Sequence, residues 1–170
     1  KDIGMIGAGV LLSASPWLSA FSEVVETSGE KCRLAIIGPG SRGRFLMSFL
    51  VQNPKVEIVA LCDIYKPSIE KALELAPKAK VYDDYREILE DKTVDAVLVA
   101  TPLNSHCQIV LDAFDAGKHV FCEKSIGFTM EECFRIYNKH ISTEKVFFTG
   151  QQRLFDPRYI KAMEMIHAGT

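Results

Sequence analysis

Three glycines, Gly38, Gly40 and Gly43, fit the pattern G-x-G-x-x-G and could bind an anion through the backbone. In such a loop the first glycine allows a tight turn, the second lets the backbone approach a diphosphate, and the third permits close packing of helix on strand. The free N–H groups and the dipole at a helix start favour negative charge there. We therefore predict a diphosphate site at this loop, with Ser41 and Arg42 inside it and Arg42 adding positive charge.

The segments around the loop are those that such a site needs. Residues 34–37 form an apolar run typical of a buried parallel strand, and apolar residues recur at helical spacing over 45–50. A second apolar strand, 56–62, ends in Asp63, which lies 20 residues after Gly43. An acid at this distance accepts hydrogen bonds from the adenosine ribose of a dinucleotide. The alternative is a packing turn followed by a helix-capping Asp63, but the two signals together favour a dinucleotide site.

The remaining chain alternates between predicted strands and helices. Strands separated by helices imply right-handed crossovers and a parallel sheet, so the expected fold class is α/β, a doubly wound Rossmann fold over residues 31–170. We expect further strands at 80–82, 94–100, 119–123 and 146–149, and further helices at 67–75, 85–89, 105–116, 129–140 and 157–168.

Polar or special residues follow several of these strands. Thr101, Pro102 and Asn104 come after the strand at 94–100, and Glu123 and Lys124 end the next one. Ligands of open parallel sheets bind outside the carboxyl ends of the strands, where the strand order reverses. We therefore expect these residues to converge with the glycine loop and with the acid after the second strand.

The amino-acid composition favours a globular protein and argues against a nucleic-acid-binding one. The 170 residues are 48% hydrophobic and 25% charged with a net charge of −2, which is typical of a globular protein and gives no basic excess for nucleic acid. The five cysteines show no C-x-x-C pair, so we predict core packing for most of them and no metal site.

The first 30 residues form a separate predicted segment. Residues 3–22 carry no charge and have an apolar centre at 5–12, as in a secretory signal peptide that lacks its basic start. A membrane anchor is a poor fit because of the glycines, serines and Pro16, and a second nucleotide loop fails because its third glycine would fall at Leu12. A flexible or packed extension is the alternative. Export would place the protein in the periplasm, by a twin-arginine route if it folds around its cofactor first; otherwise it is cytoplasmic.

Five ordered motifs together resemble the Gfo/Idh/MocA oxidoreductase family, named for glucose-fructose oxidoreductase and inositol dehydrogenase. They are Gly-Pro-Gly-Ser-Arg-Gly at 38–43, Cys-Asp at 62–63, Ala-Thr-Pro at 100–102 with His106, Gly-Lys-His-Val-Phe-Cys-Glu-Lys at 117–124, and Gln-Gln-Arg at 151–153. The resemblance covers residues 31–170 and corresponds to the family's N-terminal cofactor domain.

The resemblance implies a nicotinamide cofactor whose path is lined by Glu123 and by the loop from Thr101 to His106, with Lys124 near the nicotinamide and the substrate. A lysine there can bond to a substrate hydroxyl and transfer a proton; the alternative is a surface lysine that pairs with Glu123. The family usually has proline after the Glu-Lys pair, where this chain has Ser125. Members also continue into a second domain that supplies substrate contacts and oligomer interfaces. That substrate domain is expected to be absent from this chain, so activity and the homo-oligomer would belong to the full-length protein.

Three functions follow as hypotheses. The first is hydride transfer between NAD and a hydroxyl of a sugar or sugar derivative, with NAD favoured over NADP because Asp63 repels an added phosphate and Lys66 offsets this only in part. The second is NAD-dependent glycoside hydrolysis by transient oxidation of the sugar. The third is a non-catalytic nucleotide-binding module.

Overall fold

A parallel sheet lies at the centre of the protein in the computed structural model, which describes residues 31–169. All strand pairings in it are parallel, so every connection must cross over one face of the sheet. Its six strands are β1 (Cys32–Ile37), β2 (Val56–Cys62), β3 (Lys80–Tyr82), β4 (Ala96–Val99), β5 (His119–Cys122) and β6 (Phe147–Thr149).

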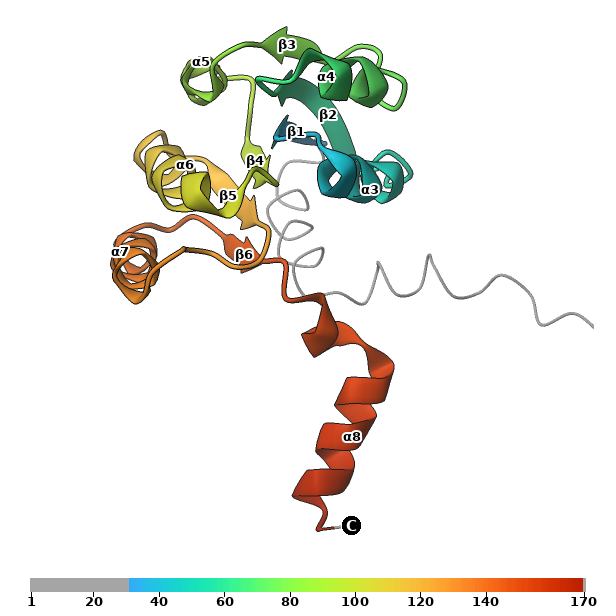
Figure 1. Ribbon diagram of the computed structural model, residues 1–170, viewed down its shortest axis with the longest axis vertical. Coiled ribbons are helices and arrows are strands. Elements are labelled where there is room, and N and C mark those ends of the chain that lie inside the picture. Colours follow the sequence, from blue (N-terminus) through green and yellow to red (C-terminus); the bar gives the residue numbers. More distant parts are fainter. Residues whose placement is uncertain (1–30, 170) are drawn as a thin grey trace, which may run out of the picture.

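Helices cover both faces of this sheet (Figure 1). One face carries α3 (Ser41–Leu50) and α4 (Lys66–Leu73), and the other carries α5 (Tyr85–Glu90), α6 (Leu103–Asp115) and α7 (Met130–Ile141). The strand order is β3-β2-β1-β4-β5-β6, so the chain runs outward from β1 to β3 and then returns to place β4 beside β1. This arrangement confirms the predicted Rossmann fold, and its reversal point lies between β1 and β4.

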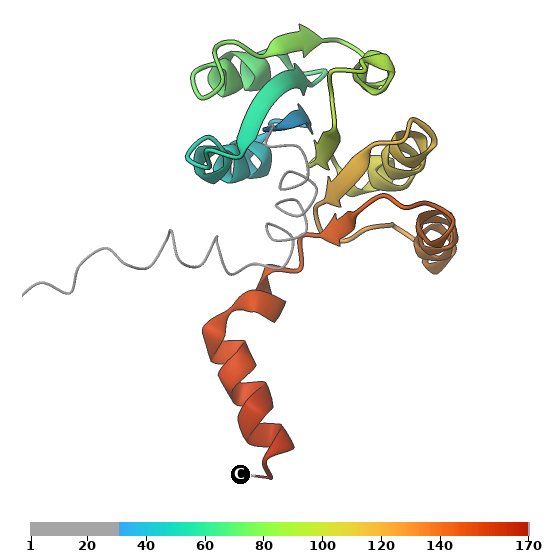
Figure 2. The same cartoon turned by 180° about the vertical axis from the view of Figure 1, so that it is seen from behind.

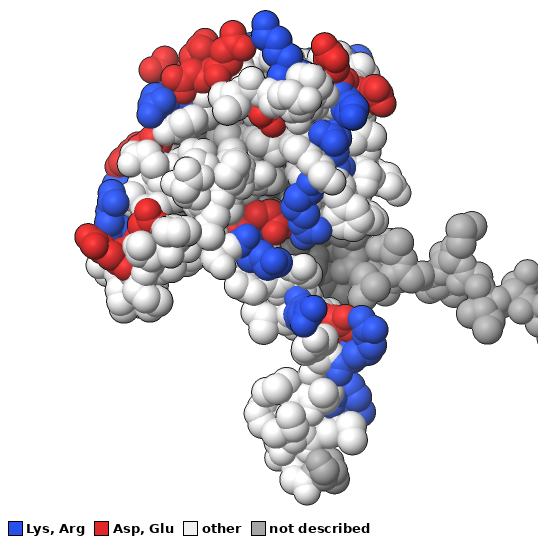
Figure 3. All heavy atoms as spheres, in the orientation of Figure 1, with Lys and Arg blue, Asp and Glu red and all other residues white. Residues whose placement is uncertain are grey.

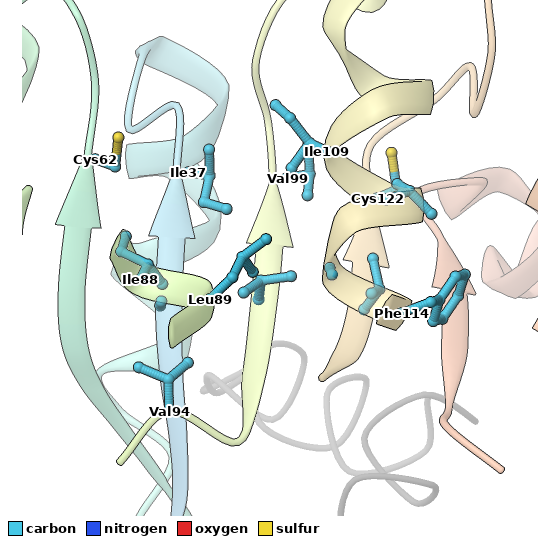
Figure 4. Packing of buried hydrophobic residues seen from close by; sticks show 14 of the residues in the cluster. Ile37, Cys62, Ile88, Leu89, Val94, Val99, Ile109, Phe114 and Cys122 are labelled. Carbon is cyan, nitrogen blue, oxygen red and sulfur yellow. The ribbon is translucent and has the colours of Figure 1, made fainter. Parts of the chain in front are cut away.

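Alternate strand residues point to opposite faces and build two cores. Ile37, Val99 and Cys122 pack under α5 and α6, as the close view in Figure 4 shows. Ile36 and Leu98, their neighbours along the strands, pack under α3 and α4 instead. The central strands β1, β4 and β5 are therefore buried on both sides, which explains why they appear in the sequence as continuous apolar runs, whereas the edge strands β3 and β6 are partly exposed.

The cysteines belong to these cores. Four of the five are buried, and all five are free thiols. Burial raises the pKa of the Cys62 thiol to about 11 and that of Cys122 to about 12, so both stay neutral at physiological pH. The prediction of core packing for most cysteines is confirmed.

Polar contacts close the amino-terminal edge of the sheet. The Lys118 side chain is 7% exposed, and its Nζ donates hydrogen bonds of 2.8 Å to the carbonyl oxygens of Asp91 and Val94. Burial lowers the pKa of Lys118, an effect that the nearby carboxylates of Asp91 and Asp95 oppose. Beside it, Arg33 and Asp95 join β1 to the start of β4 through contacts of 2.7 to 3.0 Å. This edge is therefore fastened by side chains that lie far from the predicted site.

The helices begin in two different ways. The side chain of Asp84 accepts the backbone N–H of Arg86 at the start of α5, and Thr129 forms a capping box with Glu132 at the start of α7. By contrast, the N-caps of α3 and α6 are Gly40 and a proline, which give no side-chain hydrogen bond to the helix. The first N–H groups of α3 and α6 are thus left without a side-chain cap.

After β6, the chain leaves the sheet through the short 3-10 helix η1 (Gln152–Phe155) and α8 (Pro157–His167), which points away from the other helices (Figure 2). Residues of α8 are exposed along its whole length, including Tyr159, Ile160 and Ile166. Within residues 31–169, no helix combines the length and the apolar character that crossing a membrane requires. The predicted export signal at residues 3–22 lies outside the described residues.

Candidate functional site

The glycine loop connects β1 to α3 and has the backbone geometry that its sequence predicts. Gly38 has a φ of +84°, and its N–H donates to the carbonyl oxygen of Cys62 at 2.8 Å. A Cβ on Gly38 would lie 2.7 Å from the backbone nitrogen of Thr101. Glycine is therefore required here both for the left-handed conformation and for the close approach of the loop after β4.

The other two glycines, Gly43 and Gly40, have different roles: Gly43 allows close packing, and Gly40 leaves open space for a ligand. A Cβ on Gly43 would lie 2.5 Å from the carbonyl oxygen of Gly38, so Gly43 lets α3 pack against the loop. A Cβ on Gly40 would meet nothing within 4 Å. The space over Gly40 is open beside the uncapped start of α3, where Ser41 and Arg42 form the first turn. These features fit a dinucleotide diphosphate held by backbone N–H groups.

A cleft of about 840 Å³ opens next to this loop, at the carboxyl ends of β1, β2, β3 and β4. Asp63 lines it, and its Oδ1 accepts the backbone N–H of Tyr65 at 2.9 Å, which fixes the acid in a turn after β2. Six predicted residues line this cleft together: Gly38, Gly40, Asp63, Thr101, Pro102 and Asn104. The cleft therefore joins the glycine loop to the predicted ribose-binding acid.

One wall of the cleft was missed by the sequence reasoning. Asp83, Asp84, Tyr85 and Arg86 line it from the end of β3 and the start of α5. The Arg86 guanidinium lies 4.7 Å from the centre of the Tyr85 ring and 3.3 Å from each carboxylate oxygen of Asp84. Figure 3 shows acidic side chains gathered over this part of the molecule. Their position in the sequence could have identified them, because they directly follow a predicted strand, and the residues after parallel strands gather at one edge of the sheet.

The loop after β4 also lines the cleft. Thr101 and Pro102 follow the strand, and the Ser105 hydroxyl donates to the Thr101 Oγ1 at 2.8 Å, within the first turn of α6. This contact orders the loop above the start of the helix. Asn104 faces the same cleft from α6.

Glu123 is buried behind the glycine loop rather than in the cleft lining. Its side chain is 8% exposed, and its Oε1 accepts a hydrogen bond of 2.7 Å from the Nε of Arg42. A Cβ on Gly150 would lie 2.9 Å from both carboxylate oxygens, so the chain after β6 packs directly against the acid. Glu123 thus links the first turn of α3 to the ends of β5 and β6.

Lys124 follows Glu123 and is exposed. Its backbone N–H lies 3.3 Å from Oε2 of Glu123, whereas its side chain makes no ion pair to another described residue. The alternative interpretation, a lysine paired with Glu123, is not what the structure shows, because Arg42 occupies that position. The peptide bond from Lys124 to Ser125 is cis.

The four histidines differ in their surroundings. His106 is 1% exposed and lies in the first turns of α6, with both ring nitrogens against backbone carbonyl oxygens of Thr101 and Ser125. It therefore lies behind the cleft wall. His119 accepts the backbone N–H of Val146 through Nδ1, and burial lowers its pKa. Within the described part of the chain, no group of acidic, histidine and cysteine side chains could hold a metal ion.

Comparison with protein families identifies the domain. Residues 32–151 match the model of the Gfo/Idh/MocA family, described as an oxidoreductase family with an NAD-binding Rossmann fold. The matched segment runs from the first residue of β1 to just beyond β6 and so includes every site residue described above.

Curated relatives include both a glycosyl hydrolase and a dehydrogenase. A glycosyl hydrolase family 109 protein from Stenotrophomonas maltophilia is 31% identical over 93% of this chain and 38% of its own length. A myo-inositol 2-dehydrogenase from Thermotoga maritima is also 31% identical, over 81% of this chain and 41% of its own length. The chain thus spans about two fifths of the length of these relatives.

Solved structures show the same fold. The myo-inositol dehydrogenase from Lactobacillus casei in complex with NAD(H) and myo-inositol is 32% identical with a TM-score of 0.76, over 82% of this chain and 42% of that one. An NAD-binding protein from Listeria innocua is 33% identical with a TM-score of 0.74, over 83% of this chain and 41% of that one. From the family match, the glycine loop and the strand order together, we conclude that this chain belongs to the Gfo/Idh/MocA oxidoreductase family and forms its NAD-binding Rossmann domain.

Proposed function

We propose that the protein transfers a hydride between NAD and a hydroxyl-bearing carbon of a sugar or sugar derivative. The observation that carries this proposal is the open space over Gly40, which adjoins the cleft lined by Asp63. Backbone N–H groups of α3 would bind the diphosphate, and Asp63 would accept the ribose hydroxyls. The nicotinamide ring, when bound, supplies the hydride chemistry.

The charge of the cleft supports NAD rather than NADP. Asp63, Asp83 and Asp84 all line it, and carboxylates there would repel the additional phosphate of NADP. Arg86 is the cation of this wall, but its guanidinium already contacts Asp84 and the Tyr85 ring. Arg86 would therefore attract the additional phosphate of NADP less strongly than an unpaired arginine would.

Lys124 is the proposed acid–base residue. It follows β5 at the carboxyl edge of the sheet, beside the buried Glu123, and its side chain is exposed. Its Nζ would hydrogen-bond to the reacting hydroxyl and exchange the proton as the hydride moves. Lys124→Met would remove this proton transfer while keeping most of the aliphatic stem.

The test uses the full-length protein and a panel of polyols, sugars and sugar derivatives with NAD. Hydride transfer predicts the appearance of NADH absorbance with at least one substrate, with activity lost in Lys124→Met and NAD binding kept. Asp63→Ala should weaken NAD binding. Absence of NADH formation across the panel, together with unchanged melting in millimolar NAD, would reject the proposal.

A second candidate is glycoside cleavage with recycled NAD. The glycosyl hydrolase family 109 protein matches 93% of this chain, and an α-N-acetylgalactosaminidase from Shewanella oneidensis matches 98% of it at 27% identity. In this reaction the sugar is oxidised transiently, the glycosidic bond is eliminated, and the hydride returns to the sugar. Release of the aglycone from an aryl glycoside without net NADH would favour this function over the first.

A third outcome remains distinguishable by the same assays. If NAD binds and raises the melting temperature but neither NADH nor aglycone forms with any substrate, the domain is a nucleotide-binding module.

A further inference from the structure

The ring of His106 bridges two loops of the site. Its Nδ1 lies 2.7 Å from the carbonyl oxygen of Ser125, and its Nε2 lies 2.8 Å from the carbonyl oxygen of Thr101. The residue is 1% exposed, so water does not replace either contact. Both partners are carbonyl oxygens and can only accept, so the ring donates a hydrogen bond from the nitrogen that carries its proton, and the ring as a whole packs between the two loops.

The two carbonyls belong to segments with different tasks. Thr101 lines the cleft and follows β4, whereas Ser125 comes directly after the proposed acid–base residue Lys124. The residue before Lys124 is also fixed, because Glu123 is buried and bonded to Arg42. Lys124 therefore lies between two anchored neighbours, one tied to the glycine loop and the other tied through His106 to the cleft wall.

We propose that His106 is a positioning residue that sets the place of Lys124 relative to the cofactor cleft. The 2.7 Å contact of Nδ1 with the Ser125 carbonyl carries this role, and the 2.8 Å contact of Nε2 with the Thr101 carbonyl holds the ring against the cleft wall. The inference rests on the proposed hydride transfer for its kinetic consequence. Its structural content, the anchoring of the segment 124–127, does not depend on activity.

The two bonds can be removed separately by substitution. An asparagine amide places its nitrogen near the position of Nδ1, and a glutamine amide reaches the position of Nε2. His106→Asn therefore keeps a donor for Ser125 and loses the bond to Thr101. His106→Gln does the reverse. The two variants are similar in polarity, and they differ in which loop they release.

The kinetic experiment compares these variants in the full-length protein. We expect His106→Gln to lower kcat about tenfold or more, with the KM for NAD within about threefold of the original, because the lysine is displaced while the cofactor cleft remains. His106→Asn should lower kcat less than His106→Gln does, because it keeps a donor for the Ser125 carbonyl. A matched control is His140→Gln, whose ring Nε2 lies 3.2 Å from the Lys145 carbonyl oxygen, away from the site; its kcat should be unchanged. Equal loss of kcat in His106→Asn and His106→Gln would overturn the proposal.

Hydrogen exchange provides a readout that needs no substrate. Amide exchange over residues 124–127 should accelerate in His106→Gln and stay near the original rate in His106→Asn, with global unfolding stability matched by denaturant titration. If the unsubstituted protein proves inactive, the proposed function fails, and this exchange pattern still decides whether His106 anchors the segment. Unchanged exchange in His106→Gln would reject the anchoring role.

Discussion

The Nε of Arg42 donates a 2.7 Å hydrogen bond to Oε1 of Glu123, which joins the first turn of α3 to the end of β5 across the intervening β4. Arg42 was expected to add positive charge to the diphosphate loop. The structure shows that one of its nitrogens is already committed to a buried carboxylate, while the side chain as a whole remains 38% exposed. The pair therefore couples the glycine loop to the segment that carries Lys124.

Substitution of two glycines should separate binding from packing. Gly40→Ala adds a methyl group in open space, so we expect unfolding free energy to change by less than about 1 kcal/mol while NAD binding weakens at least tenfold, roughly 1.4 kcal/mol. Gly43→Ala places a methyl 2.5 Å from the Gly38 carbonyl oxygen and should cost about 1–3 kcal/mol of stability. Denaturant titration measures the unfolding free energy of each variant, and calorimetry measures its affinity for NAD. Equal NAD binding by Gly40→Ala and the original protein would contradict the diphosphate site.

Asp63 should set the preference between the two nicotinamide cofactors. Asp63→Asn preserves an oxygen that can accept the Tyr65 N–H but removes the charge, so the fold should be kept. We expect NAD affinity to fall and NADP affinity to rise, because the repulsion of the added phosphate is reduced. The control is Asp91→Asn, on the opposite edge of the sheet. A ratio of NAD to NADP affinity that is the same in Asp63→Asn as in the original protein would show that the carboxylate does not select the cofactor.

Gly150 and Glu123 should be energetically coupled. Gly150→Ala would place a methyl 2.9 Å from the Glu123 carboxylate oxygens, and we expect it to cost about 1–3 kcal/mol in unfolding free energy. In a Glu123→Ala background the same change meets no carboxylate, so a double-mutant cycle should give a coupling of about 0.5–3 kcal/mol. Additive effects in the cycle would mean that the contact carries no strain. Urea titration of the original protein, the two single variants and the double variant measures the unfolding free energies that enter the cycle.

Acid should weaken the fold through Asp91. Its carboxylate accepts hydrogen bonds from the Thr93 hydroxyl and N–H and from the Tyr82 hydroxyl, which hold its pKa well below the usual 3.8. The native state therefore binds fewer protons at Asp91 than the unfolded chain does, so the stabilisation is complete well above pH 3.8 and is lost as the pH falls toward the native pKa. Asp91→Asn should be less stable than the original protein at neutral pH. The difference between them should shrink below about pH 3 in denaturant titrations; a constant difference would exclude Asp91 as the titrating group.

Local sequence patterns were sufficient to predict the architecture of this protein. The apolar runs and helical spacings predicted the order and type of all strands and of helices α3 to α8. The signal is clearest for β1, β4 and β5, which are buried on both faces. Boundaries were less accurate. The strand expected at 94–100 is Ala96–Val99, since the side chain of Asp95 turns to bind Arg33 and Val94 gives its carbonyl to Lys118.

Relationships between distant residues could not be predicted in the same way. The partners Arg42 and Glu123 are 81 residues apart in sequence, and no spacing rule assigns one to the other. His106 was placed near the cofactor path by resemblance, but its burial depends on how α6 packs against the loop after β5. The acidic wall after β3 was overlooked although the strand itself was predicted at 80–82, because the residues that follow it were not grouped with those at the other strand ends.

The side-chain contacts of Lys118, Arg33 and Asp95 stabilise the amino-terminal edge of the sheet. This edge lies at the opposite end of the strands from the cofactor loops. Protein engineers can therefore randomise the loops that follow β1, β2, β4 and β5 to redirect cofactor or substrate choice, while leaving these three positions untouched as a fixed base. Libraries built on this division should retain folded, expressible members at a higher rate than libraries that vary both edges.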